Sequence, residues 1–224
     1  MAADGPSCAV IGAGAWGTTL ATLLSKAAPV TLMARDEAHA ATLRADGENR
    51  HYLPGVPLDE HISVTADPAA LTAATELVVF AVPSCAMRST AASVAPVLPG
   101  SAVLVSVAKG IEAGSLLRMT EVIASEVPGA AGRVAALSGP NLALEISRGL
   151  PAAAVVGAAH DEVSRRAVEI LGRRTFRLYR NQDIVGVELA GALKNIVAIV
   201  AGAVEELGAG DNAKAAITTR GLAE

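Results

Sequence analysis

Apolar positions along the chain fall into two kinds of segment. Short runs rich in Val, Ile and Leu predict buried strands, and the longer stretches between them place apolar residues at helical spacing. The predicted strands cover residues 7–12, 30–34, 62–65, 76–82, 102–108, 134–139, 152–158 and 176–180. The predicted helices cover residues 15–27, 36–46, 84–95, 115–125, 141–148 and 161–172.

This alternation predicts the fold class. Strands that are apolar throughout are typical of a parallel sheet covered by helices on both faces. We therefore expect a doubly wound, mostly parallel Rossmann-type α/β domain over residues 1–184. From Asp183 onwards the composition is that of continuous helix, so we place the start of an all-helical second domain at residues 185–224.

The helical segment is too short to form a core of its own, because it holds only about 40 residues. We expect it to dock onto the sheet domain or onto a partner chain, which would make a homodimer through the helical segment. The other interpretation is that the chain is a C-terminally truncated form of a longer protein.

Composition and charge exclude several classes of function. A net charge of −4, a pI of about 5.6 and 2% aromatic residues argue against nucleic-acid binding. Cys8 and Cys85 lie in apolar segments without metal-ligand spacing, so we predict reduced core cysteines and no metal site. The N-terminus lacks a signal-peptide pattern, and Glu188 and Lys194 interrupt the longest apolar stretch. We predict a soluble, cytoplasmic protein without membrane insertion.

The segment CAVIGAGAWGTTLA carries a glycine motif between a strand and a helix. Gly12 would permit the tight turn, Gly14 would let the backbone approach a pyrophosphate, and Gly17 would let the helix pack close to the strand. The pyrophosphate would lie at the helix N-terminus, where free N–H groups and the macrodipole favour an anion. This arrangement predicts a dinucleotide-binding site.

The residues after the second strand bear on the choice of dinucleotide. Arg35 comes first, and its planar guanidinium suits the 2′-phosphate of NADP. Asp36 could instead accept hydrogen bonds from the ribose of NAD, although an N-cap of the following helix is the interpretation we favour. The pattern favours NADPH and leaves NADH open.

Three strand ends should meet at one edge of the sheet, where open α/β sheets bind ligands. Pro83, Lys109 and the Gly139–Asn141 segment each follow a predicted strand. Lys109 comes directly after a buried strand, so its ammonium should emerge at this edge. A lysine that merely caps the strand in solvent is the alternative.

Lys194 lies in an apolar helical segment, GVELAGALKNIVAIVAG. Helical spacing predicts a broad apolar face packed into a core, formed by residues 189, 193, 196, 197, 200 and 204. Lys194 would lie beside that face. Because a buried, unpaired ammonium is costly, it should meet a polar cavity or a bound anion. The alternative is a lysine that reaches the surface along its own alkyl chain.

Seven segments together resemble the bacterial NAD(P)-dependent glycerol-3-phosphate dehydrogenases, from about residue 7 to the last residue. They are IGAGAWGTTLA, NRHYLPG, AVPS, AKGIE, SGPNLALEI, GVELAGALKNIVAI and GDNAKAAITTRGLAE. Members of this family interconvert sn-glycerol 3-phosphate and dihydroxyacetone phosphate for phospholipid synthesis. The family continues for roughly another hundred residues, with an Asp of the catalytic set and a Ser-Arg-Asn run that holds the substrate phosphate.

The resemblance implies roles for individual residues. Lys194 matches the catalytic proton acceptor, and Lys109 matches a lysine that touches both cofactor and substrate. The other implied substrate contacts are Gly139, Asn141 and Asn195. The implied cofactor contacts are Gly12, Gly14, Ala15, Trp16, Gly17, Arg35, Pro83 and Ala143.

The implied chemistry is hydride transfer from NAD(P)H to the substrate C2, with Lys194 supplying the proton to the C2 oxygen. Two lysines in one partly desolvated pocket should lower each other's pKa. Two alternatives stay open. One is a truncated, weakly active or inactive NADP-binding protein, and the other is a related 2-hydroxyacid or ketopantoate-type dehydrogenase.

Overall fold

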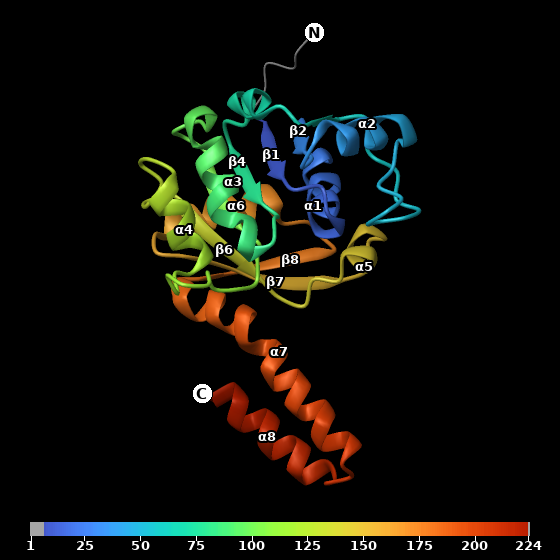
Figure 1. The fold of residues 1–224 in the computed structure, drawn as a ribbon, viewed down its shortest axis with the longest axis vertical. Coiled ribbons are helices and arrows are strands. Elements are labelled where there is room, and N and C mark those ends of the chain that lie inside the picture. Colours follow the sequence, from blue (N-terminus) through green and yellow to red (C-terminus); the bar gives the residue numbers. More distant parts are fainter. Residues whose placement is uncertain (1–6, 224) are drawn as a thin grey trace.

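One eight-stranded sheet organises the computed structural model, which describes residues 7–223 (Figure 1). The strand order is β3-β2-β1-β4-β5-β6-β7-β8, and every neighbouring pair is parallel except β6 and β7. The strands are β1 (Cys8–Ile11), β2 (Val30–Met33), β3 (Ile62–Thr65), β4 (Leu77–Phe80), β5 (Val103–Ser106), β6 (Val134–Ser138), β7 (Ala152–Ala158) and β8 (Phe176–Asn181). The predicted strands and the mostly parallel Rossmann-type architecture are confirmed.

The central strands are buried on both faces, as their uniform apolarity predicts. Neighbouring residues of one strand belong to different cores: Val79 packs in one apolar cluster and Val78 in the other. The first cluster also contains Leu20 and Leu171, and the second contains Met87. The sheet therefore separates two helix-covered cores.

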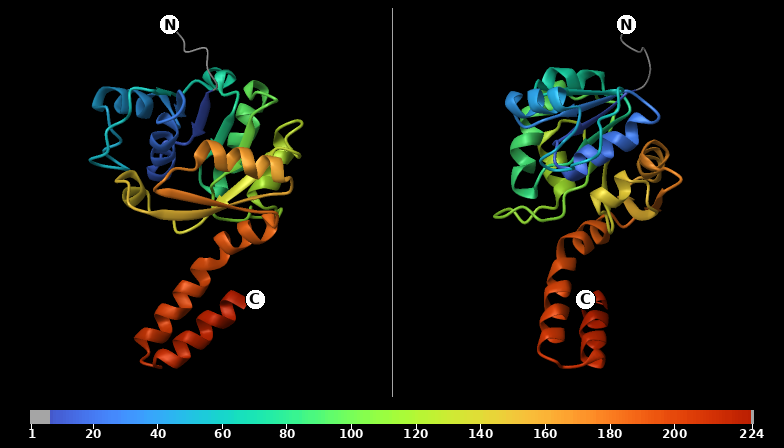
Figure 2. Two further views of the ribbon diagram at one scale, coloured as in Figure 1. Left: turned by 180° about the vertical axis from the view of Figure 1, so that it is seen from behind. Right: turned by 90° about the vertical axis from the view of Figure 1, so that its right-hand side faces the viewer.

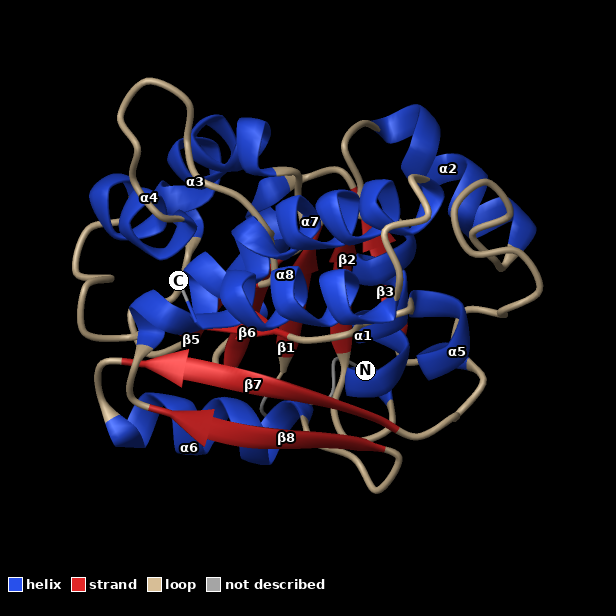
Figure 3. Cartoon of the chain, turned by 90° about the horizontal axis from the view of Figure 1, so that it is seen from below, coloured by secondary structure: helices blue, strands red, loops and turns tan. Residues whose placement is uncertain are grey.

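Helices cover both faces of the sheet (Figure 3). α1 and α6 supply the first core, and α3 and α4 supply the second. The helices are α1 (Ala15–Ser25), α2 (Glu37–Asp46), α3 (Met87–Val94), α4 (Met119–Glu126), α5 (Ala143–Ser147), α6 (Asp161–Leu171), α7 (Ile184–Glu206) and α8 (Asp211–Ala223). α4 begins only at Met119, later than predicted, because Arg118 forms an isolated bridge with Ile111.

The two last helices form a hairpin that extends away from the sheet (Figures 1 and 2). Only the first turns of α7 pack on β6 and β7, and beyond them α7 faces α8. Leu193, Ile196 and Ile199 are consequently 46%, 60% and 72% exposed. The prediction that this segment packs into a core is wrong beyond its first turns, because the helix leaves the domain there.

The structure also bears on the two cysteines and on the membrane-spanning potential of α7. Cys8 is buried in β1, whereas Cys85 is exposed in the 3₁₀ turn after β4, so the prediction of two core cysteines is wrong for Cys85. Within residues 7–223, α7 is the one helix whose length and apolar composition would suffice to cross a membrane. A single helix of this kind is weak evidence for a membrane span, and the absence of membrane insertion stays a prediction.

Candidate active site

The glycine motif forms the turn between β1 and α1. Gly12 has φ of +107°, and a Cβ placed there would come within 2.6 Å of the carbonyl oxygen of Ala81. A Cβ at Gly17 would come within 1.9 Å of the carbonyl oxygen of Gly12. The tight turn and the close approach of helix to strand, predicted from the sequence, are therefore confirmed.

Gly14 differs from its two neighbours in the motif. It is the N-cap of α1, and a Cβ there would meet no protein atom within 4 Å. The first intrahelical hydrogen bond runs from the Thr18 amide to the Gly14 carbonyl at 2.9 Å, so the amides of Ala15 and Trp16 precede it. The space beside this helix N-terminus suits an anion.

The turn also occupies the switch point of the sheet. β1 lies between β2 and β4, so the chain proceeds from β1 in one direction to β3 and then crosses to β4 on the other side. In open α/β sheets this is the place where ligands bind beyond the carboxyl ends of the strands. Pro83 follows β4 at the same edge.

Two polar side chains that sequence reasoning missed fix the surroundings of the turn. Asn49 is buried in the loop after α2, and its amide donates to the Ala13 carbonyl at 2.9 Å and to Thr18 Oγ1 at 2.8 Å. Thr19 Oγ1 donates to the Ala143 carbonyl at 3.2 Å, which ties α5 to α1. Asn49 begins the segment NRHYLPG that contributes to the family resemblance, but no sequence pattern assigns a partner to its side chain.

Trp16 and Ala143 lie close to this turn in different ways. The Trp16 indole packs edge-on against Phe176, with ring centroids 5.9 Å apart, so its side chain belongs largely to the core. A dinucleotide contact at position 16 would therefore involve the backbone amide. Ala15 and Ala143 line one hollow of about 410 Å³ together with Tyr52.

Arg35 and Asp36 follow β2 as predicted. Asp36 caps α2 by accepting from the His39 amide at 2.8 Å, and Arg35 Nε donates to its other oxygen at 3.0 Å. These hydrogen bonds, that of His39 first, lower the pKa of the Asp36 carboxyl. The predicted N-cap is confirmed, and the Arg35 side chain is 82% exposed.

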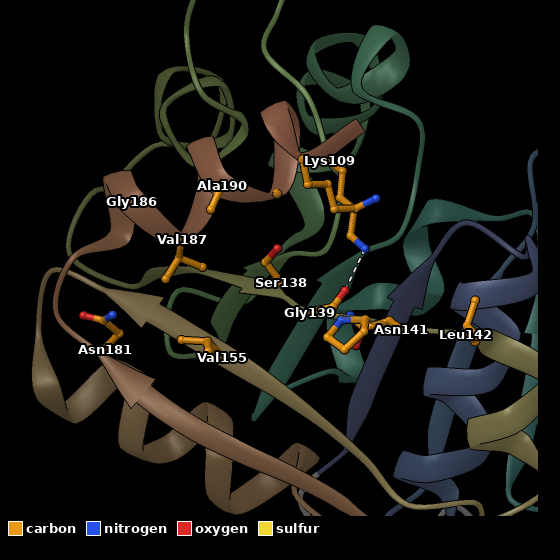
Figure 4. A pocket seen from close by; sticks show the side chains of 13 residues that line it. Lys109, Ser138, Gly139, Asn141, Leu142, Val155, Asn181, Gly186, Val187 and Ala190 are labelled. Atoms are coloured by element: carbon orange, nitrogen blue, oxygen red, sulfur yellow. Dashed lines mark hydrogen bonds between the residues drawn. The ribbon is translucent and has the colours of Figure 1, made fainter. Parts of the chain in front are cut away.

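A cavity of about 720 Å³ lies between the first turns of α7, the start of the loop after β6, and β7 (Figure 4). It gathers Lys109, Gly139, Asn141 and Lys194, four of the five residues predicted to contact substrate. The fifth, Asn195, is exposed and is not among the lining residues. Lysines from the loop after β5 and from α7, distant in the sequence, thus line one site.

Lys109 emerges at the sheet edge as predicted. Its Nζ donates to the Gly139 carbonyl at 2.9 Å (Figure 4). Lys109 is exposed as a residue, but its ammonium is partly desolvated. This desolvation, and secondly the positive charge of Lys194, lowers the pKa of Lys109. The predicted mutual influence of the two lysines is confirmed for Lys109.

Lys194 lines the same cavity but is exposed, so the prediction of a desolvated ammonium is wrong. The reason is the departure of α7 from the sheet just before this residue. Its Nζ donates to Asn195 Oδ1 at 2.6 Å. Asn195 does not line the cavity itself, but it holds the ammonium of Lys194, which does.

Asn141 carries the most informative polar group of the cavity. Its side-chain Nδ2 and Oδ1 atoms are both buried, and neither has a hydrogen-bond partner among the described residues. Leaving a buried amide unsatisfied is unfavourable by about 1–3 kcal/mol. A polar ligand in the cavity could supply the missing partners.

Gly191 and Glu188 fix the position of α7 against the rest of the domain. A Cβ at Gly191 would come within 2.6 Å of Ser138 Oγ, so the helix lies close to β6 at this glycine and a larger residue would require the Ser138 hydroxyl to move. Glu188 is buried, and its carboxylate is held by the start of α4. Sequence reasoning treated Glu188 only as an interruption of an apolar run, although a lone carboxylate in an apolar helix is itself a signal for a buried partner.

Comparisons with known proteins agree on one family. Residues 7–164 match the family model described as the NAD-dependent glycerol-3-phosphate dehydrogenase N-terminus, and residues 183–224 match the C-terminus model of the same family. A glycerol-3-phosphate dehydrogenase [NAD(P)+] of Moorella thermoacetica is 48% identical over 219 residues. That alignment covers 97% of this chain and 64% of the relative, so the chain spans less than two thirds of the relative's length.

Solved structures give the same result. The crystal structure of a Coxiella burnetii glycerol-3-phosphate dehydrogenase matches with a TM-score of 0.85 and 37% identity, covering 97% of this chain and 66% of that one. A ketopantoate reductase from Ralstonia eutropha matches with a TM-score of 0.62 and 22% identity, covering 85% of this chain and 60% of that one. The second likeness extends to the fold alone.

Proposed function

Because the chain belongs to the NAD-dependent glycerol-3-phosphate dehydrogenase family, we propose that it serves the reduction of dihydroxyacetone phosphate to sn-glycerol 3-phosphate. The observation that carries the proposal is the convergence of Lys109, Lys194 and the unpartnered Asn141 amide on one cavity. This cavity opens at the sheet edge that also bears the glycine turn.

NAD(P) would be held by residues at the ends of β1, β2 and β4. The amides at the start of α1 would donate hydrogen bonds to the pyrophosphate, with Gly14 leaving room for it. Arg35 would bind the 2′-phosphate of NADP, because its guanidinium is exposed while Asp36 is engaged as a helix cap. This arrangement supports a preference for NADPH. When bound, the nicotinamide supplies the hydride.

The chain's own residues would position the substrate and move the proton. Lys109 and Lys194 attract the phosphorylated triose electrostatically, and the Asn141 amide can donate to one substrate oxygen and accept from another. Lys194 would donate its proton to the C2 oxygen in reduction and take it back in oxidation. Asn195 would hold the Lys194 ammonium in place.

The proposal also covers how the chain divides into domains, how it assembles and where it is located. Residues 1–184 would form the dinucleotide domain, and residues 185–224 would belong to the substrate domain. The exposed Leu193, Ile196 and Ile199 side chains support burial of this face against a second copy in a cytoplasmic homodimer. Multi-angle light scattering of the purified chain would measure its mass, and a monomer at micromolar concentration would contradict the dimer.

Two assays on the purified chain test the proposal. Titration with NADPH should quench the fluorescence of Trp16, the single tryptophan. Dihydroxyacetone phosphate should then cause NADPH oxidation, followed by the loss of the near-ultraviolet absorbance of the reduced nicotinamide. Quenching without oxidation would favour an inactive NADP-binding protein. Oxidation with ketopantoate or a 2-oxoacid in place of the triose phosphate would favour a related dehydrogenase.

A further inference from the structure

Glu188 forms the polar contact between the helix that carries Lys194 and the rest of the molecule. Its side chain is 5% exposed and lies at the second turn of α7. One oxygen, Oε1, accepts from the Thr120 amide at 2.9 Å. The other, Oε2, accepts from Arg118 Nη1 and from Thr120 Oγ1, both at 2.6 Å.

We propose that Glu188 is a positioning residue that holds α7 in the place where Lys194 meets Lys109. The inference rests on the proposed function for its catalytic meaning, but its geometry stands on contacts of this chain. The carboxylate engages the first turn of α4 through the Thr120 amide and hydroxyl, whereas Gly191 of the same helix lies against Ser138 and Lys109.

The remaining contacts of α7 explain why such a fixed point is needed. Beyond Gly191 the helix leaves the sheet and packs only on α8. Lys194 lies six residues beyond Glu188, which is about 9 Å along the helix axis at about 1.5 Å per residue. A small tilt at the base of the helix is therefore amplified at the lysine. Gly191 permits close approach to Ser138 but provides no directional bond.

Arg118 is itself held in position. Its backbone amide donates to Glu121 Oε2 at 2.9 Å, and its Nη2 donates to Glu121 Oε1 at 2.7 Å. The guanidinium that meets Glu188 is thus fixed to the N-terminus of α4, which packs in the second core. The ion pair connects α7 to a rigid element instead of to a mobile surface side chain.

Glu188→Gln tests the proposal with little change of shape. An amide has one acceptor oxygen, so its NH₂ group must face either the Thr120 amide or the Arg118 guanidinium, and one donor loses its acceptor. Glu206→Gln is the matched control, because Glu206 lies on the same helix and is exposed. Thr120→Val removes one of the three hydrogen bonds and serves as the milder variant if Glu188→Gln does not fold.

The first readout is independent of enzymatic activity. A short amine-to-amine cross-linker should join Lys109 to Lys194 in the parent chain and in Glu206→Gln, as identified by peptide mass spectrometry. Glu188→Gln should lose this cross-link while its far-ultraviolet circular dichroism and its affinity for NADPH stay unchanged. An undiminished cross-link in folded Glu188→Gln and in Thr120→Val would overturn the positioning role.

The second readout separates positioning from binding. If Lys194 donates the proton, Glu188→Gln should lower kcat for dihydroxyacetone phosphate by about 100-fold with little change in the KM for NADPH. Unchanged kcat together with a lost cross-link would overturn the catalytic assignment of Lys194 and leave the positioning role supported. A parent chain that forms the cross-link but oxidises no NADPH would contradict the proposed function alone.

Discussion

The side chains of Lys109 and Lys194 line one cavity from two different segments, the loop after β5 and the middle of α7. The charge of Lys194 contributes to the lowered pKa of Lys109, after burial. Like charges are brought together at some electrostatic cost, which an anionic ligand between them would relieve.

The pKa of Lys109 should rise when Lys194 is replaced by Met, because one of its two causes of depression is removed while burial remains. NMR of methyl-labelled lysines across a pH titration would measure this pKa.

The lowered pKa of Lys109 also affects stability, because the unfolded chain binds more protons than the folded chain at alkaline pH. The free energy of unfolding should therefore rise as the pH approaches the ordinary lysine value of 10.5. A Lys109 pKa that does not move in Lys194→Met would contradict the coupling.

Asn141→Ala should separate stability from binding. The variant removes a buried amide that has no partner, so the free energy of unfolding in urea should stay the same or increase. Affinity for dihydroxyacetone phosphate should fall about tenfold, equivalent to about 1.4 kcal/mol, measured by calorimetry with NADPH present. A strong loss of stability would mean that the amide is satisfied within the folded protein.

Two glycine variants should lose different properties: Gly17→Ala should lose stability, and Gly14→Ala should lose affinity for NADPH. Gly17→Ala places a Cβ within 1.9 Å of the Gly12 carbonyl oxygen and should destabilise the protein by about 1–3 kcal/mol or more. Gly14→Ala meets no protein atom and should retain its unfolding midpoint, but its NADPH affinity should drop because the methyl group occupies the space of the pyrophosphate. Unaltered NADPH binding by Gly14→Ala would place the dinucleotide elsewhere.

Arg35→Ala tests the preference for NADPH. The side chain is exposed and pairs only with its neighbour Asp36 among the contacts we describe, so stability should change little. The KM for NADPH should increase about tenfold through loss of a charge-assisted contact, with the KM for NADH nearly constant. Equal changes with both cofactors would show that Arg35 does not recognise the 2′-phosphate.

Much of the fold could be predicted because local patterns decide it. Apolar runs such as Leu77–Phe80 form central strands, and Gly12 and Gly17 have the steric roles that their spacing predicts. The approximate positions of Lys109 and Asn141 followed from the rule that parallel strands end at one edge.

The misses that concern the site depend on long-range packing. Helical spacing assigns an apolar face to residues 189–204 but carries no information about whether a partner covers it, so the exposure of Lys194 and Leu193 was not foreseen. The partners of Glu188 and Asn49 lie about 70 and about 30 residues away in the sequence. A lone carboxylate in an apolar helix indicates that Glu188 has a partner, but no local pattern identifies which residue that partner is.

The most direct test of the account is single-turnover oxidation of NADPH by dihydroxyacetone phosphate in the parent chain and in Lys194→Met. Lys214→Met, on α8, is the matched control because Lys214 pairs with Glu205 outside the cavity. We predict that Lys194→Met slows the reaction by about 100-fold or more while it binds NADPH normally, and that Lys214→Met reacts at the parent rate. Equal rates in Lys194→Met and the parent chain would contradict the central claim.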